Sequence, residues 1–271
     1  MNLRSMSAAI TSLSLAACSG GATTVGPAHP QDAAGAGAAV TPPPIHYEQT
    51  AVLTTDGEPT LERSYHKLLA DCQQAGAPTR ALTSDEAAKL DRTHVEAWIG
   101  PNKLSHHEQR WNLQDSPPCQ FSIVLEYDMT EIQDSNGHAT LIDAVAHTVE
   151  FQELGKWAPV RALPATDGEL TEAERVNGFT KLGMATANAA QCAVWQDRTG
   201  DQFCVWSAGR QWGYSADGAD PLHGGVSNGN SITLWAHPAP TSGWKLETNV
   251  FTVGVPLDPR AFVIPGGLTR K

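Results

Sequence analysis

The sequence contains few basic residues and no long apolar run. Of its 271 residues, 18 are Lys or Arg and 29 are Asp or Glu, which gives a formal net charge of −11. No block of Lys or Arg is present that could neutralise the phosphates of a nucleic acid or hold the protein on an anionic lipid surface. No apolar stretch reaches the roughly 20 residues that a membrane-spanning helix needs. We therefore expect neither nucleic-acid binding nor a membrane-spanning helix.

The catalytic and metal-binding motifs that the sequence approaches are incomplete. His107-Glu108 begins like the zinc-binding HExxH motif, but Trp111 stands where the second histidine belongs. Residues 213–217 resemble the GxSxG motif of serine hydrolases, except that Asp217 replaces the last glycine. No CxxC pair occurs, which disfavours a zinc site or a thioredoxin-like redox centre. The sequence therefore predicts no metal and no cofactor.

The first 17 residues have the pattern of an export signal. Arg4 precedes a weakly apolar stretch at 6–17, which is too short to span a bilayer. Residues 15–18, Leu-Ala-Ala-Cys, resemble the lipobox of bacterial lipoproteins. The resemblance implies cleavage before Cys18 and a lipid on its sulfur, and Ser19 implies sorting to the outer membrane, facing the periplasm. The alternative is a buried cysteine after an ordinary apolar helix.

Residues 18–45 are expected to form a flexible tether. They consist largely of Ala, Gly, Thr and Pro, with almost no large side chain to bury, so the segment cannot offset the entropy of ordering. A flexible chain of this length holds a domain roughly 30 Å from its anchor. With lipid on Cys18, the tether would connect the folded region to a membrane.

The other four cysteines are predicted to form two disulfides. They form an even set in a compartment that tolerates disulfides, and three pairings are possible. We favour Cys72 with Cys119 and Cys192 with Cys204, because the second pair closes a short loop across an expected hairpin.

The rest of the chain is expected to be an α+β fold, mainly antiparallel β-sheet with about three helices. An apolar fraction of 41% allows a sizeable core. Amphipathic periodicity and capping patterns predict helices at 60–75, from Thr83, and from Thr171 to about Leu182. Alternating and β-branched segments predict strands at 94–99, 108–113, 121–130, 192–196, 202–207, 231–236, 245–253 and 261–264. A proline-rich stretch suggests an α+β lobe at 46–160 and a Trp-rich β lobe at 161–271, although one continuous domain at 46–271 is almost as well supported.

The segment 121–130 is expected to begin a long hairpin through Asn136-Gly137, the dipeptide typical of a type I′ turn. Paired residue numbers then sum to 273, which places Glu126 opposite His147 on a solvated face. That face would gather four groups that could serve in acid–base chemistry or simply be solvated: Glu126, Asp128, Asp143 and His147.

The segment 207–230 is the strongest candidate for a binding site. It is rich in Gly, Asp and Ser and lacks periodicity, and long irregular loops inside a domain tend to be functional. Arg210, Trp212 and Tyr214 could bind a sugar or a peptide through ring faces and a guanidinium group. An enzyme would instead use His223 with Asp217 or Asp220. The alternative reading is that part of this segment is a strand and its aromatic residues serve the core.

The sequence therefore favours a non-catalytic, membrane-anchored envelope protein. Its partner would be an envelope protein, as for an inhibitor or immunity-type lipoprotein, or the peptidoglycan of the cell wall. The alternative is an envelope hydrolase that uses His223 with Asp217 or Asp220.

Overall fold

The computed structural model describes residues 41–271 apart from 117–118, 154–177, 213, 215–221, 224–225 and 228–230. The predicted export signal, Cys18 and most of the tether lie outside these residues. Val40–Lys271 forms one compact unit. Among the described helices, none has both the length and the apolar character needed to cross a membrane.

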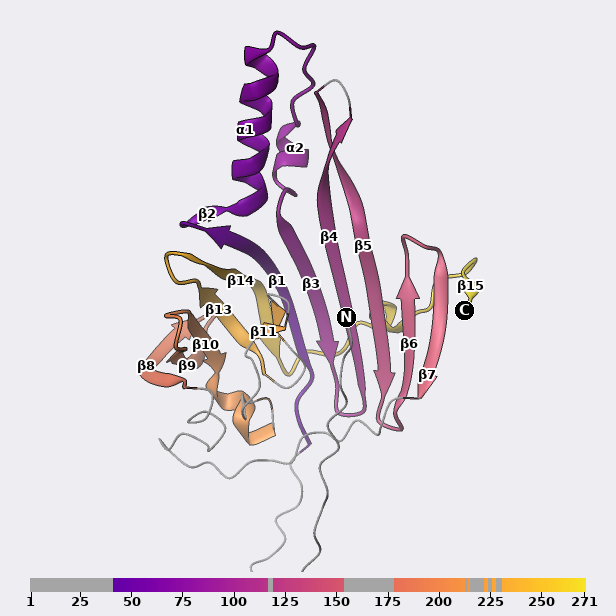
Figure 1. Cartoon of the computed structure of the whole chain (residues 1–271). Helices are drawn as coiled ribbons and strands as arrows, with labels where there is room; N and C mark the ends of the chain where they lie inside the picture. Colours follow the sequence, from indigo (N-terminus) through magenta and orange to yellow (C-terminus); the bar gives the residue numbers. More distant parts are fainter. Residues whose placement is uncertain are drawn as a thin grey trace, which may run out of the picture. The chain divides into compact units, whose positions relative to one another are not determined.

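Most of the described chain belongs to one sheet of 13 strands, in the order β15-β7-β6-β5-β4-β3-β1-β14-β13-β10-β9-β8, with β2 added beside β1 (Figure 1). All pairs are antiparallel except β15 with β7. The strands are β1 (Ile45–Thr55), β2 (Glu58–Pro59), β3 (Arg92–Ile99), β4 (Lys103–Ser116), β5 (Gln120–Asp134), β6 (His138–Asp143), β7 (Thr148–Glu153), β8 (Thr180–Ala187), β9 (Ala190–Gln196), β10 (Gln202–Trp206), β13 (Thr233–His237), β14 (Ser242–Val253) and β15 (Thr269–Arg270). A separate pair is formed by β11 (Leu222–His223) and β12 (Val226–Ser227).

The main core lies on one face of β1 and β3. Val95, Ala97 and Ile99 alternate with polar or half-buried neighbours and are at most 1% exposed. They pack with the aromatic and aliphatic side chains of β10, β13 and β14. Alternation of side chains along a strand leaves the other residues of β3 on the opposite face. The mainly antiparallel β-sheet with few helices is thus confirmed. Strands from both predicted lobes belong to the same sheet, and the predicted boundary between the lobes falls outside the described residues.

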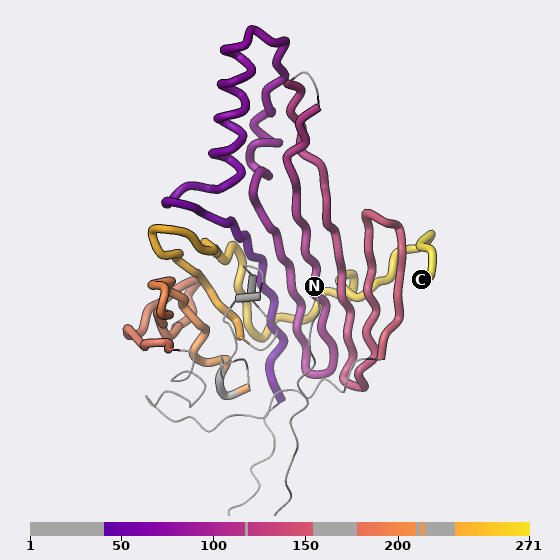
Figure 2. The backbone as a smooth tube through the Cα atoms, viewed as in Figure 1, coloured from indigo at the N-terminus to yellow at the C-terminus, as the bar shows by residue number. Residues whose placement is uncertain are grey.

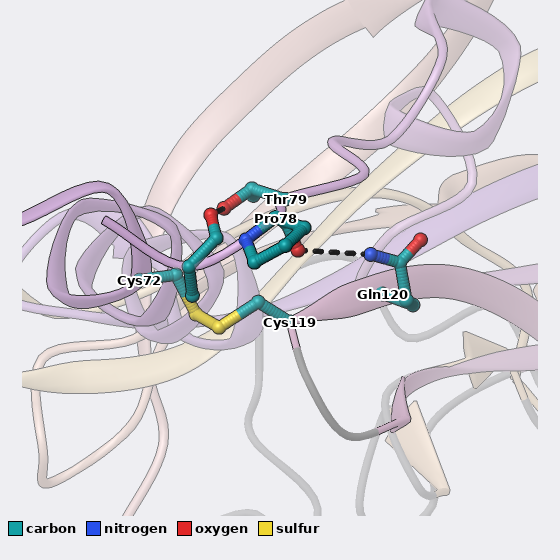
Figure 3. Close-up of a disulfide and its surroundings, with 6 residues drawn as sticks. Cys72, Pro78, Thr79, Cys119 and Gln120 are labelled. Carbon is teal, nitrogen blue, oxygen red and sulfur yellow. Dashed lines mark hydrogen bonds between the residues drawn. A yellow bond between two sulfur atoms is a disulfide. The ribbon is translucent and has the colours of Figure 1, made fainter. Parts of the chain in front are cut away.

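Helix α1 (Thr60–Gln74) packs on a second, smaller cluster made of Tyr65, Leu90 and Phe121. A disulfide between Cys72 and Cys119 ties the helix to the start of β5 (Gln120–Asp134), with 6.0 Å between the two Cα atoms. Figure 3 shows this disulfide beside the hydrogen bond that the Gln120 side chain donates to the Pro78 carbonyl, 3.0 Å long.

The second disulfide joins Cys192 and Cys204 across β9 and β10, with a Cα separation of 5.3 Å. Both favoured cysteine pairings are therefore confirmed. The predicted helix start at Thr83 is also confirmed. There α2 (Ser84–Ala87) begins with a capping box in which the hydroxyl of Thr83 accepts a hydrogen bond from the backbone N–H of Glu86.

The predicted third helix is wrong in the part that the structure describes, and α1 and α2 are the two α-helices within the described ranges. Residues 180–182 belong to strand β8, which pairs with β9 through a turn at Asn188 and Ala189, both with positive φ. Gly183 has the sequence signature of a helix end, but it lies at a shift in the β8–β9 register with φ of 151°. A β-bulge explains this glycine as well as a helix end does. Residues 171–177 lie outside the described residues.

The long hairpin has a register that differs by one residue from the prediction. Thr130 pairs with Ile142, so paired numbers sum to 272. The Asp134 carboxylate accepts hydrogen bonds from the backbone N–H groups of Asn136 and His138, 2.8 and 3.0 Å long. These bonds favour a three-residue loop with Gly137 at positive φ over the predicted type I′ turn. The predicted pairing of Glu126 with His147 is therefore wrong.

The C-terminal segment after β14 runs across one face of the sheet and reaches the edge formed by β7. It leaves β14, forms a 3-10 helix η2 (Pro259–Phe262) where the sequence predicts a strand, and ends as β15 beside β7 (Figure 2). Asp258 caps the 3-10 helix, and Pro259 fixes its first residue, which accounts for the helical turn. The segment covers part of the sheet face opposite to the main core.

Candidate functional site

A groove of about 560 Å³ lies between the C-terminal segment and the sheet face that turns away from the main core. Its walls come from β3, β4, β5, β6 and the segment 258–265. The lining residues are Glu96, Trp98, Ser105, His107, Asp128, Thr130, Ile142, Ala144, Asp258, Arg260, Ala261, Val263 and Pro265. This volume falls within the range typical of small-ligand pockets.

The register of the strands places the groove-lining residues of β3, β4 and β5 next to one another. Glu96 pairs with His107, and His107 in turn pairs with Thr130 on the next strand. Directly paired residues share a sheet face, so alternate residues of three neighbouring strands form one continuous surface. Because Val95 and Ala97 face the core, Glu96 must face the groove.

The C-terminal side of the groove is fixed by contacts with β4 and its preceding turn. The hydroxyl of Ser105 donates a 2.6 Å hydrogen bond to the Ala261 carbonyl. The ammonium group of Lys103 lies 3.9 Å from the ring centroid of Phe262. A Cβ atom on Gly100 would come within 2.6 Å of Leu257, so a glycine permits this close approach. The segment is therefore attached to the sheet at several points.

One side of the groove contains a hydrogen-bonded group around Asp128. Nε2 of His107 lies 2.6 Å from one oxygen of Asp128, and the side-chain amide of Gln109 donates to the other oxygen at 3.1 Å. Both oxygens of this carboxylate thus have partners from β4. A hydrogen-bonded imidazole and carboxylate beside a groove can bind polar ligand groups or exchange a proton with them.

The other side contains a cluster around Trp98. The imidazole of His46 stacks on the Trp98 ring, with 3.7 Å between ring centroids and an angle of 11° between the planes. Oε1 of Glu96 accepts a hydrogen bond from the Trp98 indole N–H, 2.8 Å long, and lies 3.2 Å from Nε2 of His46. Glu48, which pairs with Glu96 on the adjacent strand, has an oxygen 3.8 Å from the same nitrogen.

The groove lining carries more negative than positive charge. Glu96, Asp128 and Asp258 contribute carboxylates, whereas Arg260 is the one Lys or Arg among the described lining residues. The Arg260 guanidinium donates hydrogen bonds to the Asp258 carboxylate, the shortest 2.7 Å long, and lowers the pKa of that carboxyl group. The arrangement favours neutral or cationic ligands with several hydrogen-bond donors over polyanions.

The structure locates only part of the predicted binding segment. Trp212 stacks on Trp206, with 5.5 Å between ring centroids, and Tyr214 is 2% exposed against the same ring. Burial raises the pKa of the Tyr214 hydroxyl to about 12. Tyr214 is therefore a core residue and cannot present its ring to a ligand. Trp212 is half-buried, and its indole N–H has no hydrogen-bond partner among the described residues.

The side chains of the other predicted site residues in that segment are outside the described parts of the structure. Arg210 lies in the 3-10 helix η1 (Ser207–Trp212) and His223 lies in β11, but their side chains are not among the described parts. Asp217 and Asp220 lie outside the described residues. The predicted roles of these four residues remain predictions.

Among the four polar residues expected to share a hairpin face, only Asp128 lines the groove. Asp143 pairs with Met129 and therefore lies on the opposite face, where its carboxylate accepts a hydrogen bond from the backbone of Ala146. His147 is an exposed residue of the following turn, and Glu126 is exposed on β5. The alternation of polar and apolar residues in 94–99 and the polar side of the 121–130 strand were the available signals for the groove.

Comparison with known proteins gives no relative from which a function could be inferred. No protein-family model matches the sequence, and no curated protein matches it.

Proposed function

We propose that this chain is a lipid-anchored protein of the bacterial cell envelope that binds a saccharide-containing fragment of the cell wall in the groove between β3–β6 and residues 258–265. The main support for ligand binding is that this groove has the volume of a small-ligand pocket and paired hydrogen-bonding side chains on both sides. The cellular location is inferred from the first 18 residues, and the binding surface is on the folded unit.

The proposed cellular location rests on the lipobox-like residues 15–18 and on the tether that follows them. Lipid on Cys18 would hold the folded unit at a membrane, and Ser19 favours the outer membrane facing the periplasm. The two disulfides support an oxidising compartment, because such bonds persist there and are rare in the cytosol.

Intact-mass measurement tests the proposed location. We expect a chain that begins at Cys18, carries two or three acyl chains and has no free thiols. An unacylated chain that still begins at Met1 would contradict it.

The ligand class follows from the chemistry of the groove. Sugar hydroxyl and amide groups donate hydrogen bonds to carboxylates such as Asp128 and accept them from imidazole or guanidinium groups such as His107 and Arg260. The apolar side chains of Ile142 and Val263 offer contact for the less polar faces of a sugar ring. The amino groups on the peptide of a cell-wall fragment can pair with the carboxylates of the groove.

Calorimetric titration of the purified full-length chain with disaccharide-peptide fragments of peptidoglycan tests the binding proposal. We expect saturable binding that Asp128→Asn weakens about tenfold, because a hydrogen bond to a charged group is lost. Asp134→Asn is the matched control, since Asp134 also contacts a histidine but is the last residue of β5 and lies outside the groove. Absence of binding, or equal losses in both variants, would contradict the proposal. Capture of an envelope protein with no fragment binding would favour a protein partner instead.

A hydrolase is a second candidate, because His107 and Asp128 form a 2.6 Å imidazole–carboxylate contact at the groove wall. Such a pair can act as a general base on a bound water. Release of soluble fragments from peptidoglycan, abolished by His107→Gln, would favour catalysis. The enzyme hypothesis that uses His223 with Asp217 or Asp220 remains a separate prediction.

A further inference from the structure

Three potential metal ligands meet where β1 and β3 lie side by side. They are Nε2 of His46 and one carboxylate oxygen each of Glu48 and Glu96, and all three atoms lie within 4.8 Å of one another. Glu48 and Glu96 are directly paired across the two strands. The cluster adjoins the groove through Glu96, which belongs to both.

Trp98 holds two of the three ligands in position. Its ring stacks on the His46 imidazole, which is only 9% exposed, and its indole N–H donates to the Glu96 carboxylate. Metal sites commonly use such outer contacts to orient the residues that bind the ion. The imidazole thus points its Nε2 toward the two carboxylates before any ion arrives.

The two distances from the His46 nitrogen to the glutamate oxygens already approach those of a tetrahedral site. With metal–ligand bonds of about 2.0 to 2.2 Å, two ligands of a tetrahedral zinc ion lie roughly 3.3 to 3.6 Å apart. Nε2 of His46 lies 3.2 Å from Oε1 of Glu96 and 3.8 Å from Oε1 of Glu48. The two glutamate oxygens lie within 4.8 Å of each other, so adjustments of about 1 Å or less in two half-exposed side chains would complete a tetrahedral arrangement.

The charges of the cluster also differ from those of an ordinary histidine–carboxylate pair. His107 with Asp128 and His138 with Asp134 each combine one imidazole with one carboxylate. The His46 nitrogen faces two carboxylates, which leaves negative charge for a cation to neutralise. Other charged groups near the cluster are Arg260, whose guanidinium is hydrogen-bonded to Asp258 and interacts electrostatically with Glu96, and Asp258 itself.

We propose that His46, Glu48 and Glu96 bind one divalent transition-metal ion, with zinc as the best fit to a nitrogen and two oxygen ligands. Three protein ligands leave one position of a tetrahedral ion open, as in catalytic zinc sites. The open position would face the groove through Glu96 and could receive water or a ligand oxygen. This inference does not depend on the saccharide, because the ion would bind without it.

Calorimetric titration of the purified full-length chain with zinc, after removal of metal by a chelator, tests the inference. We expect one strong site per chain, and we expect Glu48→Gln to weaken binding by at least about 100-fold because one of three ligands is lost. Glu48 is half-exposed and does not line the groove, so this variant should fold and bind cell-wall fragments normally. His138→Gln is the matched control, because it removes a histidine that faces a single carboxylate.

Cobalt gives a second readout. We expect the absorption spectrum of cobalt bound to the wild-type chain to indicate four-coordinate geometry, and we expect Glu48→Gln to lose that signal while His138→Gln retains it. Absence of a strong zinc site in the wild-type chain would overturn the inference. Equal zinc affinity of the wild type and Glu48→Gln, with both proteins folded, would also overturn it. A wild-type chain that binds zinc but no cell-wall fragment would support the metal site alone, and a wild-type chain that binds the fragment but has no strong zinc site would support the saccharide groove alone.

Discussion

Two adjacent histidines on β4 lie on opposite faces of the sheet. His107 faces the groove and contacts Asp128, whereas His106 lies beside Ala97 and Glu131 on the other face. Burial, and to a smaller extent the charge of His107, lowers the pKa of His106 to about 4. Burial also raises the pKa of Glu131. The surroundings of His106 and Glu131 on one face thus favour neutral side chains, while the other face gathers charged groups around a groove.

Strand β3 shows the same division. Val95, Ala97 and Ile99 support the core, and Glu96 and Trp98 line the groove. Because side chains alternate along a strand, a single segment can stabilise the fold on one side and bind a ligand on the other. Substitutions one residue apart should therefore have very different consequences.

The largest effect should come from Ile99→Ala on the core face. Ile99 is 1% exposed, and removal of its buried methyl and methylene groups should lower the free energy of unfolding by about 3 kcal/mol. Urea unfolding measures this change. Glu96→Gln, three residues away on the groove face, should change the free energy of unfolding by less than about 1 kcal/mol. Similar losses in both variants would break the contrast between the faces.

A smaller effect is expected for Ser105→Ala on the groove face. The hydroxyl of this buried residue donates a 2.6 Å hydrogen bond to the Ala261 carbonyl, and its loss should cost about 1 kcal/mol. Relative to the wild type, the variant should show a larger increase in the hydrogen-exchange rate in residues 258–265 than in β3. Unchanged exchange in the C-terminal segment would show that Ser105 does not attach it to the sheet.

The two faces should also differ in their response to pH. The ordinary pKa of histidine is 6.5 and that of folded His106 is about 4, so the unfolded chain binds the proton first as the pH falls. His106 therefore lowers the free energy of unfolding progressively from pH 6.5 to about 4. His106→Gln should flatten this dependence in urea-unfolding measurements.

Glu131 should act in the opposite direction. Its pKa is raised above the ordinary value of 4.5, so the folded chain keeps this proton longer and loses stability as the pH rises through the folded pKa. Glu131→Gln should therefore steepen the acid-induced loss that His106 causes. If neither substitution alters the pH dependence, the desolvation of this face is not supported.

The smallest effect is expected for Arg260→Gln. The side chain is largely exposed, and its guanidinium pairs with Asp258 in solvent. The urea midpoint should not change measurably, because exposed ion pairs contribute little. Zinc affinity should rise by about twofold at low salt, since one nearby positive charge is removed, and the gain should disappear at high salt. A large loss of stability would show that Arg260 supports the fold.

Local sequence patterns predict the helices near 60–75 and 84–87, most strands and the two disulfides, because each depends on periodicity, capping or spacing within a short segment. The hairpin register was missed because the Asp134 carboxylate accepts backbone hydrogen bonds within the turn. The third helix was predicted from a capping pattern and Gly183, and β8 occupies the part of that segment that the structure describes.

The groove could not be predicted from local patterns, because its walls are distant in sequence. Ser105 and Ala261, which touch, are separated by 156 residues. His107-Glu108 was compared with a helical zinc motif, whereas both residues lie in a strand and alternate between faces. The metal cluster was missed for a similar reason, because His46 and Glu96 meet only through the pairing of β1 with β3.

The indole N–H of Trp98 reports most directly on the claim that the polar sheet face binds ligands. It donates to Glu96 at the edge of the groove, whereas Trp206 is buried in the main core. In a nitrogen–proton NMR spectrum, Trp98→Phe and Trp206→Phe assign the two indole signals. Peptidoglycan fragments are predicted to shift the Trp98 signal saturably and to leave the Trp206 signal in place. A Trp98 signal that does not move, or two signals that move together, would contradict the account.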